Sequence, residues 1–188
     1  MKKFMKTFIS SALVGLVFVS PAFAKTPTPA PSLTPVDTLV MEEKEEYLLP
    51  YPGILPDHPL YFLKALRDRI LEVLIVDPLR KSEFYLLQAD KRLNMAIFAG
   101  NKGAVSQMAQ SVTVAEQFME RTVSGLVTFR NSGSQVPASM VDRLEKSMAK
   151  HAEVLDELIV NAAETQRAIY DTALAKVRSL QGEVGKLK

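Results

Sequence analysis

The chain has 188 residues and a formal net charge of +2 at pH 7, with 11 prolines, two histidines and no cysteine. A chain without cysteine has no disulfide, thiol catalyst or thiolate metal site, and two distant histidines make a closed structural zinc site unexpected. About 130 residues after the N-terminal region are enough to bury one hydrophobic core without such cross-links.

The first 24 residues have the pattern of a secretory signal peptide. Three lysines among the first six residues precede an apolar run from Phe8 to Val19, and Ala22-Phe23-Ala24 forms a small-x-small cleavage site. The run is shorter than the ~18 to 20 residues that span a bilayer, so a retained membrane anchor is the less favoured alternative. We therefore expect cleavage after Ala24, a secreted, periplasmic or cell-envelope location, and no stable membrane span afterwards.

Removing this leader changes the charge of the chain. The leader holds three lysines and no acidic residue, so the formal charge falls from +2 for the whole chain to −1 for residues 25–188. Nucleic-acid binding requires a lasting basic face that displaces counterions from phosphate. We therefore expect no nucleic-acid partner.

Residues 25–46 are predicted to be a disordered linker, rich first in proline and then in acidic residues. Lys25 to Val40 has little to bury, which favours a semi-extended spacer. Four glutamates follow between positions 42 and 46. They are a candidate cation-binding or partner-binding patch, and the favoured interpretation is a solvated, charged lead-in.

A single helical domain is predicted over residues 47–188. Four prolines between positions 50 and 59 keep the first part extended, with a turn at Pro52-Gly53. We expect the first helix to begin at Asp57, whose carboxylate would cap the first turn, with Pro59 where a missing N–H costs little. This helix is amphipathic, because one face carries Leu63, Leu66, Ile70 and Leu74 and another carries Lys64, Asp68 and Glu72.

The second helix is predicted to start at Asp77-Pro78, a cap followed by proline, and to end at Ile97 or Phe98 with Gly100 as its stop. The connection of one or two residues makes the first two helices an antiparallel hairpin. In the third helix, Gly125 weakens the helix modestly and permits close approach of another helix. Its apolar residues form a coiled-coil-like heptad seam of Val105, Met108, Val112, Ala115, Met119, Thr122, Leu126 and Phe129.

The segments LPDHPLYFLKALRDRI and VDPLRKSEFYLLQADKRL resemble the opening of a bacterial exported helical domain-of-unknown-function family. The features that carry the resemblance are a Leu-Pro-Asp-x-Pro-Leu-Tyr start and an Asp-Pro start to the second helix. The resemblance covers residues 47–100 and implies a helical fold and export. The family has no assigned activity or catalytic residues, so it implies none here.

The segment after Pro137 is predicted to be one very long helix or two. Apolar residues keep a spacing of three and four from Val141 to Ala162 and again, after a shift of phase, from Ile169 to Val184. A single helix of about 40 residues would be about 60 Å long and would outreach its partners. We expect either a break near Asn161 to Thr165 or a C-terminal half that projects from the bundle. The predicted fold is therefore all-α, a mostly antiparallel bundle of about four helices with a long C-terminal helix.

The candidate partner surface consists of four aromatic residues near the start of the domain, namely Tyr47, Tyr51, Tyr61 and Phe62. Amphipathic aromatic side chains beside rigid, extended backbone are common at recognition surfaces. The favoured alternative is that this segment packs across the helices and caps the core, because its aliphatic residues would otherwise be exposed to water.

His151 is the candidate pH-responsive residue, because it lies on the apolar stripe of the last segment. A lone histidine on such a stripe is usually a core-edge residue with a satisfied ring nitrogen. The functional alternative is a pH-responsive contact, or a metal ligand together with Glu153 or a facing acid. The methionines of the third helix are a candidate soft-metal or adaptable surface, although their helical spacing favours core filling.

No catalytic motif, phosphate-binding loop or metal-ligand cluster is evident, so we expect no enzyme, cofactor or metal. The sequence predicts a non-catalytic extracytoplasmic helical module for protein–protein association or envelope organisation, with a partner in the cell envelope or a second copy of itself. The alternative is an exported helical stress protein, a chaperone or a metal or pH sensor, with a cradle of Met108, Met119, Met148 and His151. A hydrolase would require two carboxylates that converge in a cleft.

Overall fold

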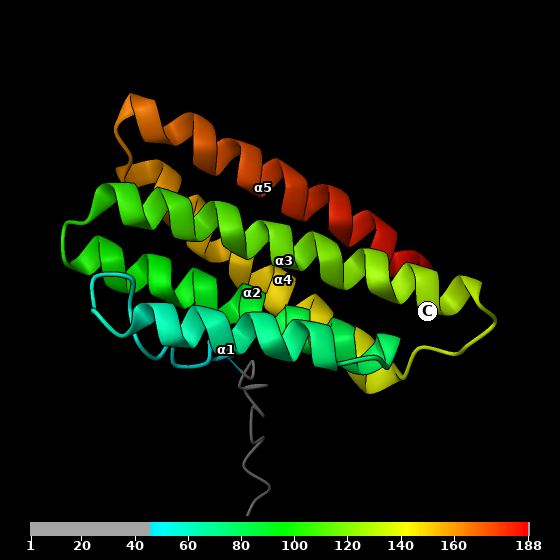
Figure 1. Ribbon diagram of the computed structural model, residues 1–188. Coiled ribbons are helices and arrows are strands. Elements are labelled where there is room, and N and C mark those ends of the chain that lie inside the picture. The colour runs from blue at the N-terminus through cyan, green and yellow to red at the C-terminus, as the bar shows by residue number, and fades with distance from the viewer. Residues whose placement is uncertain (1–45, 188) are drawn as a thin grey trace, which may run out of the picture. The chain divides into compact units, whose positions relative to one another are not determined.

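The structure is a computed structural model that describes residues 46–187. The predicted signal peptide, residues 25–45 of the predicted linker and the last residue lie outside this range. Over residues 46–187 the chain forms five α-helices and no strand (Figure 1). The predicted all-α, mostly antiparallel architecture is confirmed.

The five helices follow one another with short connections. Each runs opposite to the one before it, α2 packs mainly on α3, and α5 packs on both α4 and α3 (Figure 1). The bounds are α1 Tyr61–Leu74, α2 Pro78–Asn101, α3 Val105–Asn131, α4 Ala138–Asn161 and α5 Glu164–Val184, followed by a 3₁₀ turn, η1, Gly185–Leu187.

The break expected in the C-terminal segment is present. α4 ends at Asn161, and Ala162 and Ala163 have extended backbones with ψ of 142° and 154° before α5 begins. The side chain of Asn161 donates to the carbonyl of Glu157 at 3.0 Å. The long C-terminal helix therefore folds back along α3, and the shift of phase in the apolar spacing marks the corner.

One predicted helix start is confirmed and two other predicted limits are wrong. Asp77 caps α2, since its carboxylate accepts from the backbone N–H of Arg80 at 2.7 Å. Asp57 caps no helix: α1 begins only at Tyr61, and the Asp57 carboxylate accepts instead from Lys102 at 2.8 Å. α2 does not stop at Gly100 but ends at Asn101. The glycine with positive φ in the turn that follows is Gly103, where φ is 71°.

The hydrophobic core lies between α2, α3, α4 and α5. The middle of the predicted heptad seam on α3 is fully buried, and Tyr170 of α5 is the largest side chain with no exposed surface. Residues from these helices and η1 join in one cluster, which includes Leu86, Ala96, Val112, Met119, Leu126, Leu144, Met148, Leu155, Tyr170 and Val177. α1 contributes no member to this core.

Gly125 lies at a close approach of α2 and α3. A methyl group at this position would lie 2.5 Å from Ser82 Oγ and 3.7 Å from Ser82 Cβ. The Ser82 hydroxyl donates to the Pro78 carbonyl at 3.0 Å, so it would have to leave this hydrogen bond.

We therefore expect Gly125→Ala to stabilise a Ser82→Ala variant by about 1 kcal/mol through helix propensity. In the native chain the same substitution should stabilise the protein by less than this, or destabilise it. Urea unfolding of the four chains of this double-mutant cycle measures the coupling. Equal effects of Gly125→Ala in both backgrounds would contradict the close approach.

Candidate docking surface and buried charge cluster

The N-terminal segment, residues 46–60, is fastened to the bundle by Tyr47. Its hydroxyl donates to Asp90 Oδ2 at 2.7 Å, across 43 positions of sequence. Burial, followed by the hydrogen bond to Asp90, raises the pKa of Tyr47 well above its usual value. Asn94 of α2 also donates to the carbonyl of Pro50 at 3.0 Å. These contacts hold the segment across α2. This part of the segment therefore packs across the helices, as the alternative to a partner surface predicted.

Asp90 connects Tyr47 to a buried charge cluster, which consists of Asp90, Glu116, Ser147 and His151. His151 Nδ1 lies 2.8 Å from Glu116 Oε1, and His151 Nε2 lies 3.3 Å from Asp90 Oδ1. Ser147 donates to the same Asp90 oxygen at 2.5 Å. His151 is thus a fully buried residue with both ring nitrogens paired.

The cluster holds a buried positive charge between two carboxylates. Burial by itself lowers the pKa of His151, but the carboxylates of Glu116 and Asp90 overcome it and raise the pKa to about 9. The partners of His151 therefore lie on α3 and α2. Glu153, which the sequence offered as a partner, instead accepts from Lys150 at 2.7 Å.

This cluster has the chemistry of a structural ion pair, although Asp90 and Glu116 each also line a surface hollow. All four members are buried in the bundle interior. Over residues 46–187, no group of three or more His, Cys, Asp or Glu is arranged to hold a metal ion. The methionines of the proposed cradle lie in the core, where Met119 and Met148 are fully buried and Met108 packs at the edge.

The four aromatic residues of the candidate partner surface do not form one continuous surface. Tyr47 is half-buried on Asp90, and Tyr61 accepts a hydrogen bond from Arg92, whose guanidinium lies 5.7 Å from the Tyr61 ring centre. Tyr51 is exposed and packs edge-on against Phe98, with ring centres 6.0 Å apart. Phe62 is exposed on α1 and belongs to a different, larger apolar surface.

α1 is turned so that its polar face meets the bundle. Lys64 and Asp68 are each only 8% exposed, although amphipathic helices usually bury their apolar face. Lys64 Nζ donates to the carbonyls of Pro52 and Ile54 at 2.6 and 3.3 Å. Burial, together with nearby Arg92, lowers the pKa of Lys64 to about 8. The extended, proline-rich backbone leaves carbonyls without helical partners, and the lysine satisfies two of them.

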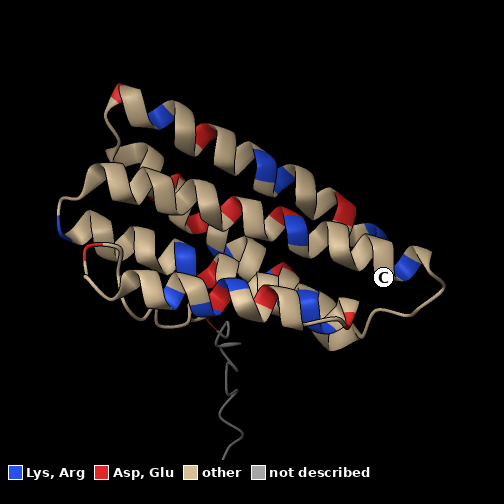
Figure 2. Cartoon of the chain, viewed as in Figure 1, with Lys and Arg blue, Asp and Glu red and all other residues tan. Residues whose placement is uncertain are grey.

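Glu72 fixes the other end of α1 on its neighbours. Its carboxylate accepts from the Tyr85 hydroxyl of α2 at 3.1 Å and from Arg121 of α3 at 3.0 Å. Charged residues of both signs lie along α1 and the helices beside it (Figure 2). These polar contacts define the rotation of α1 about its axis.

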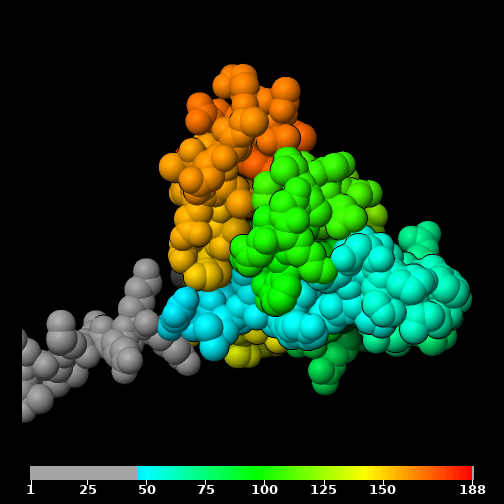
Figure 3. Space-filling model, turned by 90° about the vertical axis from the view of Figure 1, so that its left-hand side faces the viewer, coloured from blue at the N-terminus to red at the C-terminus, as the bar shows by residue number. Residues whose placement is uncertain are grey.

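The consequence is an apolar surface that faces solvent, which we call the outward face of α1. It extends over the whole helix, and exposure reaches 67% at Leu74 and 71% at Val73. α1 packs closely against none of the other described helices, and in Figure 3 it forms a ridge at the edge of the molecule, beside the N-terminal segment. The outward face consists of Phe62, Leu63, Leu66, Ile70, Val73 and Leu74.

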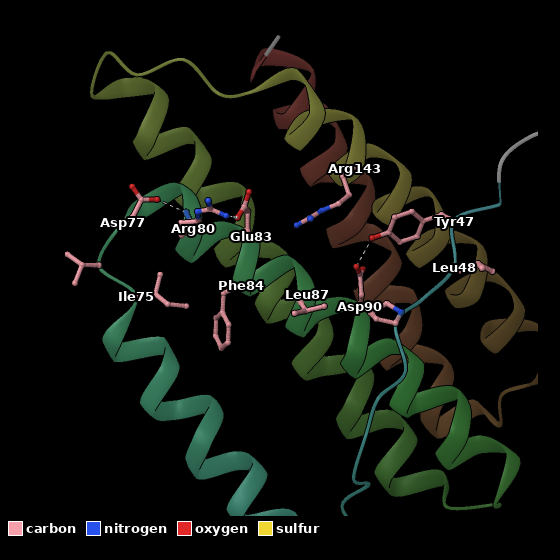
Figure 4. Close-up of a pocket in the computed structure, with 12 residues that line it drawn as sticks. Tyr47, Leu48, Ile75, Asp77, Arg80, Glu83, Phe84, Leu87, Asp90 and Arg143 are labelled. Carbon is pink, nitrogen blue, oxygen red and sulfur yellow. Dashed lines mark hydrogen bonds and ion pairs between the residues drawn. The ribbon is translucent and has the colours of Figure 1, made fainter. Parts of the chain in front are cut away.

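A groove of about 790 Å³ lies between the N-terminal segment, the start of α2 and α4 (Figure 4). Its walls include Leu48, Phe84 and Leu87, and Arg143 points into it. Each acidic residue in its wall is already bound: Asp77 by a backbone N–H, Glu83 by Arg80 at 3.2 Å, and Asp90 by Tyr47. The groove therefore does not offer the pair of converging free carboxylates that a hydrolase requires.

None of the helices in residues 46–187 is long and apolar enough to cross a membrane. Comparison with family models, curated proteins and solved structures finds no match for this chain. The resemblance of residues 47–100 to an exported helical family stays a prediction.

Sequence reasoning and the structure draw attention to different parts of this region. Sequence reasoning singled out Tyr47 and Tyr61, which face the bundle, and it missed the aliphatic outward face of α1. The signal was present in the spacing of Leu63, Leu66 and Ile70. Periodicity shows that a helix has an apolar face, but it does not show whether that face turns inward or outward.

Proposed function

We propose that this chain is a non-catalytic helical module that associates with the extracytoplasmic cell envelope through the outward face of α1. The observation that carries the proposal is the orientation of α1, which exposes six large apolar side chains and buries Lys64 and Asp68. Contiguous exposed apolar surface of this kind is typical of interaction sites. The signal-peptide pattern of residues 1–24 supports the location.

The bundle supports this function because it is complete without α1. The core is built by α2, α3, α4 and α5, and the cluster around His151 is buried among these helices. α1 contributes no core member and is held by polar contacts on its inner side. An exported chaperone is a second candidate, since it would use the same exposed surface for unfolded clients.

We predict that Leu66→Gln combined with Ile70→Gln releases the chain from the envelope without unfolding it. Both side chains are already exposed, so the free energy of unfolding should change by no more than about 0.5 kcal/mol. Each side chain buried on docking is worth about 1.5–3 kcal/mol, so association should fall by more than about tenfold. The measurement is the ratio of envelope-bound to free chain after fractionation of cells producing the full chain.

The matched control is Val160→Gln, which removes an exposed apolar side chain at the end of α4. It should leave the ratio unchanged. An equal ratio for the native chain, the control and the α1 variant would refute the proposal. The chaperone candidate is tested separately, by whether substoichiometric native chain delays aggregation of an unfolded client and the α1 variant does not.

A further inference from the structure

Building on the proposed function, we infer that the outward face of α1 binds the surface of an anionic phospholipid bilayer, with the helix lying flat in the interface. The apolar side chains enter the boundary between headgroups and acyl chains, and the bundle remains on the aqueous side. α1 has 14 residues and is thus about 21 Å long, so it lies on a bilayer and does not cross it.

The arrangement of residues around α1 is that of an interfacial helix. At about 100° per residue, the six residues of the outward face cover an arc of about 120°. Arg69 lies about 20° beyond one edge of this arc and Arg67 about 20° beyond the other. Arginines at both edges can extend their guanidinium groups to lipid phosphates while the apolar arc is buried.

The charges exposed beside the arc are positive. The side chains of Arg67 and Arg69 are 60% and 74% exposed, whereas those of Asp68 and Glu72 are 10% and 19% exposed. Arg67 binds Asp68 at 2.7 Å and Arg69 binds Glu72 at 3.4 Å, and Glu72 also binds Arg121. In each of the two pairs on α1 the arginine is the more exposed partner. An approaching surface therefore meets two guanidinium groups first, which favours phospholipids with a net negative charge.

The shape of α1 favours a lipid surface over a protein partner. α1 packs closely against no other described helix and stands as a ridge (Figure 3). A protein partner would have to supply a groove that matches this ridge, whereas a fluid lipid surface accommodates a convex helix without one.

The test uses single labelling sites, which the absence of cysteine makes possible in the full chain. Leu66→Cys places a dye on the outward face, and Val160→Cys places it on an exposed apolar position of α4. The dye is one whose emission shifts to the blue in apolar surroundings. Each chain is titrated with vesicles of phosphatidylcholine alone or mixed with phosphatidylglycerol. Because the readout is local, binding through residues 1–45 does not shift the Leu66 signal.

We expect a blue shift at Leu66, but not at Val160, with phosphatidylglycerol vesicles, and at least about tenfold weaker binding to phosphatidylcholine alone. Arg69→Gln should weaken binding about fivefold, and added salt should weaken it further. The matched control is Arg178→Gln on α5, which removes an arginine that is 62% exposed and should change nothing. A Leu66 shift that is the same for both vesicle compositions would overturn the inference.

The two proposals fail in different ways. One outcome is that the dye at Leu66 does not respond to vesicles while the Leu66→Gln, Ile70→Gln double variant is still released from the envelope. In that case the partner is a protein. The association function then stands and the lipid inference falls. If the vesicles give no shift and the same variant keeps its envelope association, both proposals fall.

Discussion

Replacing His151 with alanine should destabilise the protein by about 3–5 kcal/mol at pH 7, because it leaves two buried carboxylates without their shared cation. Glu116 Oε1 lies 2.8 Å from the imidazole and Asp90 Oδ1 lies 3.3 Å from it. Both acids are nearly inaccessible to water, so their charges would be neither paired nor hydrated. Urea unfolding followed by far-ultraviolet circular dichroism measures the loss.

The control for this prediction is a more exposed ion pair that also joins two helices of the bundle. Lys176 of α5 binds Glu120 of α3 at 2.7 Å, and the two side chains are 37% and 54% exposed. Lys176→Ala should therefore cost less than about 1 kcal/mol. Adding Glu116→Gln to His151→Ala should recover part of the loss, because it neutralises one stranded charge. If His151→Ala costs no more than Lys176→Ala, the buried cluster is not a source of stability.

The charged His151 should also make stability depend on pH in the alkaline range. Its pKa in the folded protein is raised to about 9 from an ordinary value of 6.5. The imidazolium is thus favoured by folding, and its contribution is fully present below about pH 6.5 and lost as the pH rises through about 9. The shift corresponds to about 3 kcal/mol of stability.

Lys64 acts with the opposite sign in an overlapping range. Its pKa is lowered to about 8, so burying its charge costs stability at neutral pH, and this cost disappears as the pH rises above 8. Lys64→Met removes the lysine contribution. In this variant we expect the free energy of unfolding to fall by about 3 kcal/mol between pH 6.5 and 10.

The titration of His151 can be observed directly by nuclear magnetic resonance. The chain has two histidines, so a His58→Gln variant leaves one imidazole resonance. Its midpoint should lie near pH 9. A midpoint at or below 6.5 would show that the carboxylates do not hold the proton on His151.

The features that were predicted correctly depend only on residues that lie close together in the sequence. The Asp77 cap of α2 requires a carboxylate three residues from the N–H that it binds, and this pattern is visible in the chain itself. The seam of α3 and the break after Asn161 follow from the spacing of apolar residues, which fixes what one helix can bury. These local rules were enough for the fold class.

The cluster around His151 was beyond sequence reasoning because its members lie far apart in the chain. Glu116 and Asp90 are 35 and 61 positions from His151 and come from two other helices. Their pairing depends on how three helices are rotated against one another. The sequence could only indicate that a histidine lay on an apolar stripe.

The orientation of α1 was hidden for a different physical reason. An amphipathic helix normally buries its apolar face, and the balance is reversed here by carbonyl groups of the N-terminal segment and by the partners of Glu72. The predicted cap at Asp57 is absent for a related reason, because the Asp57 carboxylate accepts a hydrogen bond from Lys102. Both depend on tertiary contacts that no short window of sequence contains.

The central claim, that α1 presents its apolar face to solvent, is tested most directly by thiol reactivity in single-cysteine variants. In native conditions, Leu66→Cys and Leu74→Cys should react with a water-soluble thiol reagent at nearly the rate of the unfolded chain. Asp68→Cys, on the inner face, should react at least about tenfold more slowly. If Asp68→Cys reacts fast and Leu66→Cys is protected, α1 is packed with its apolar face inward and the proposed docking surface does not exist.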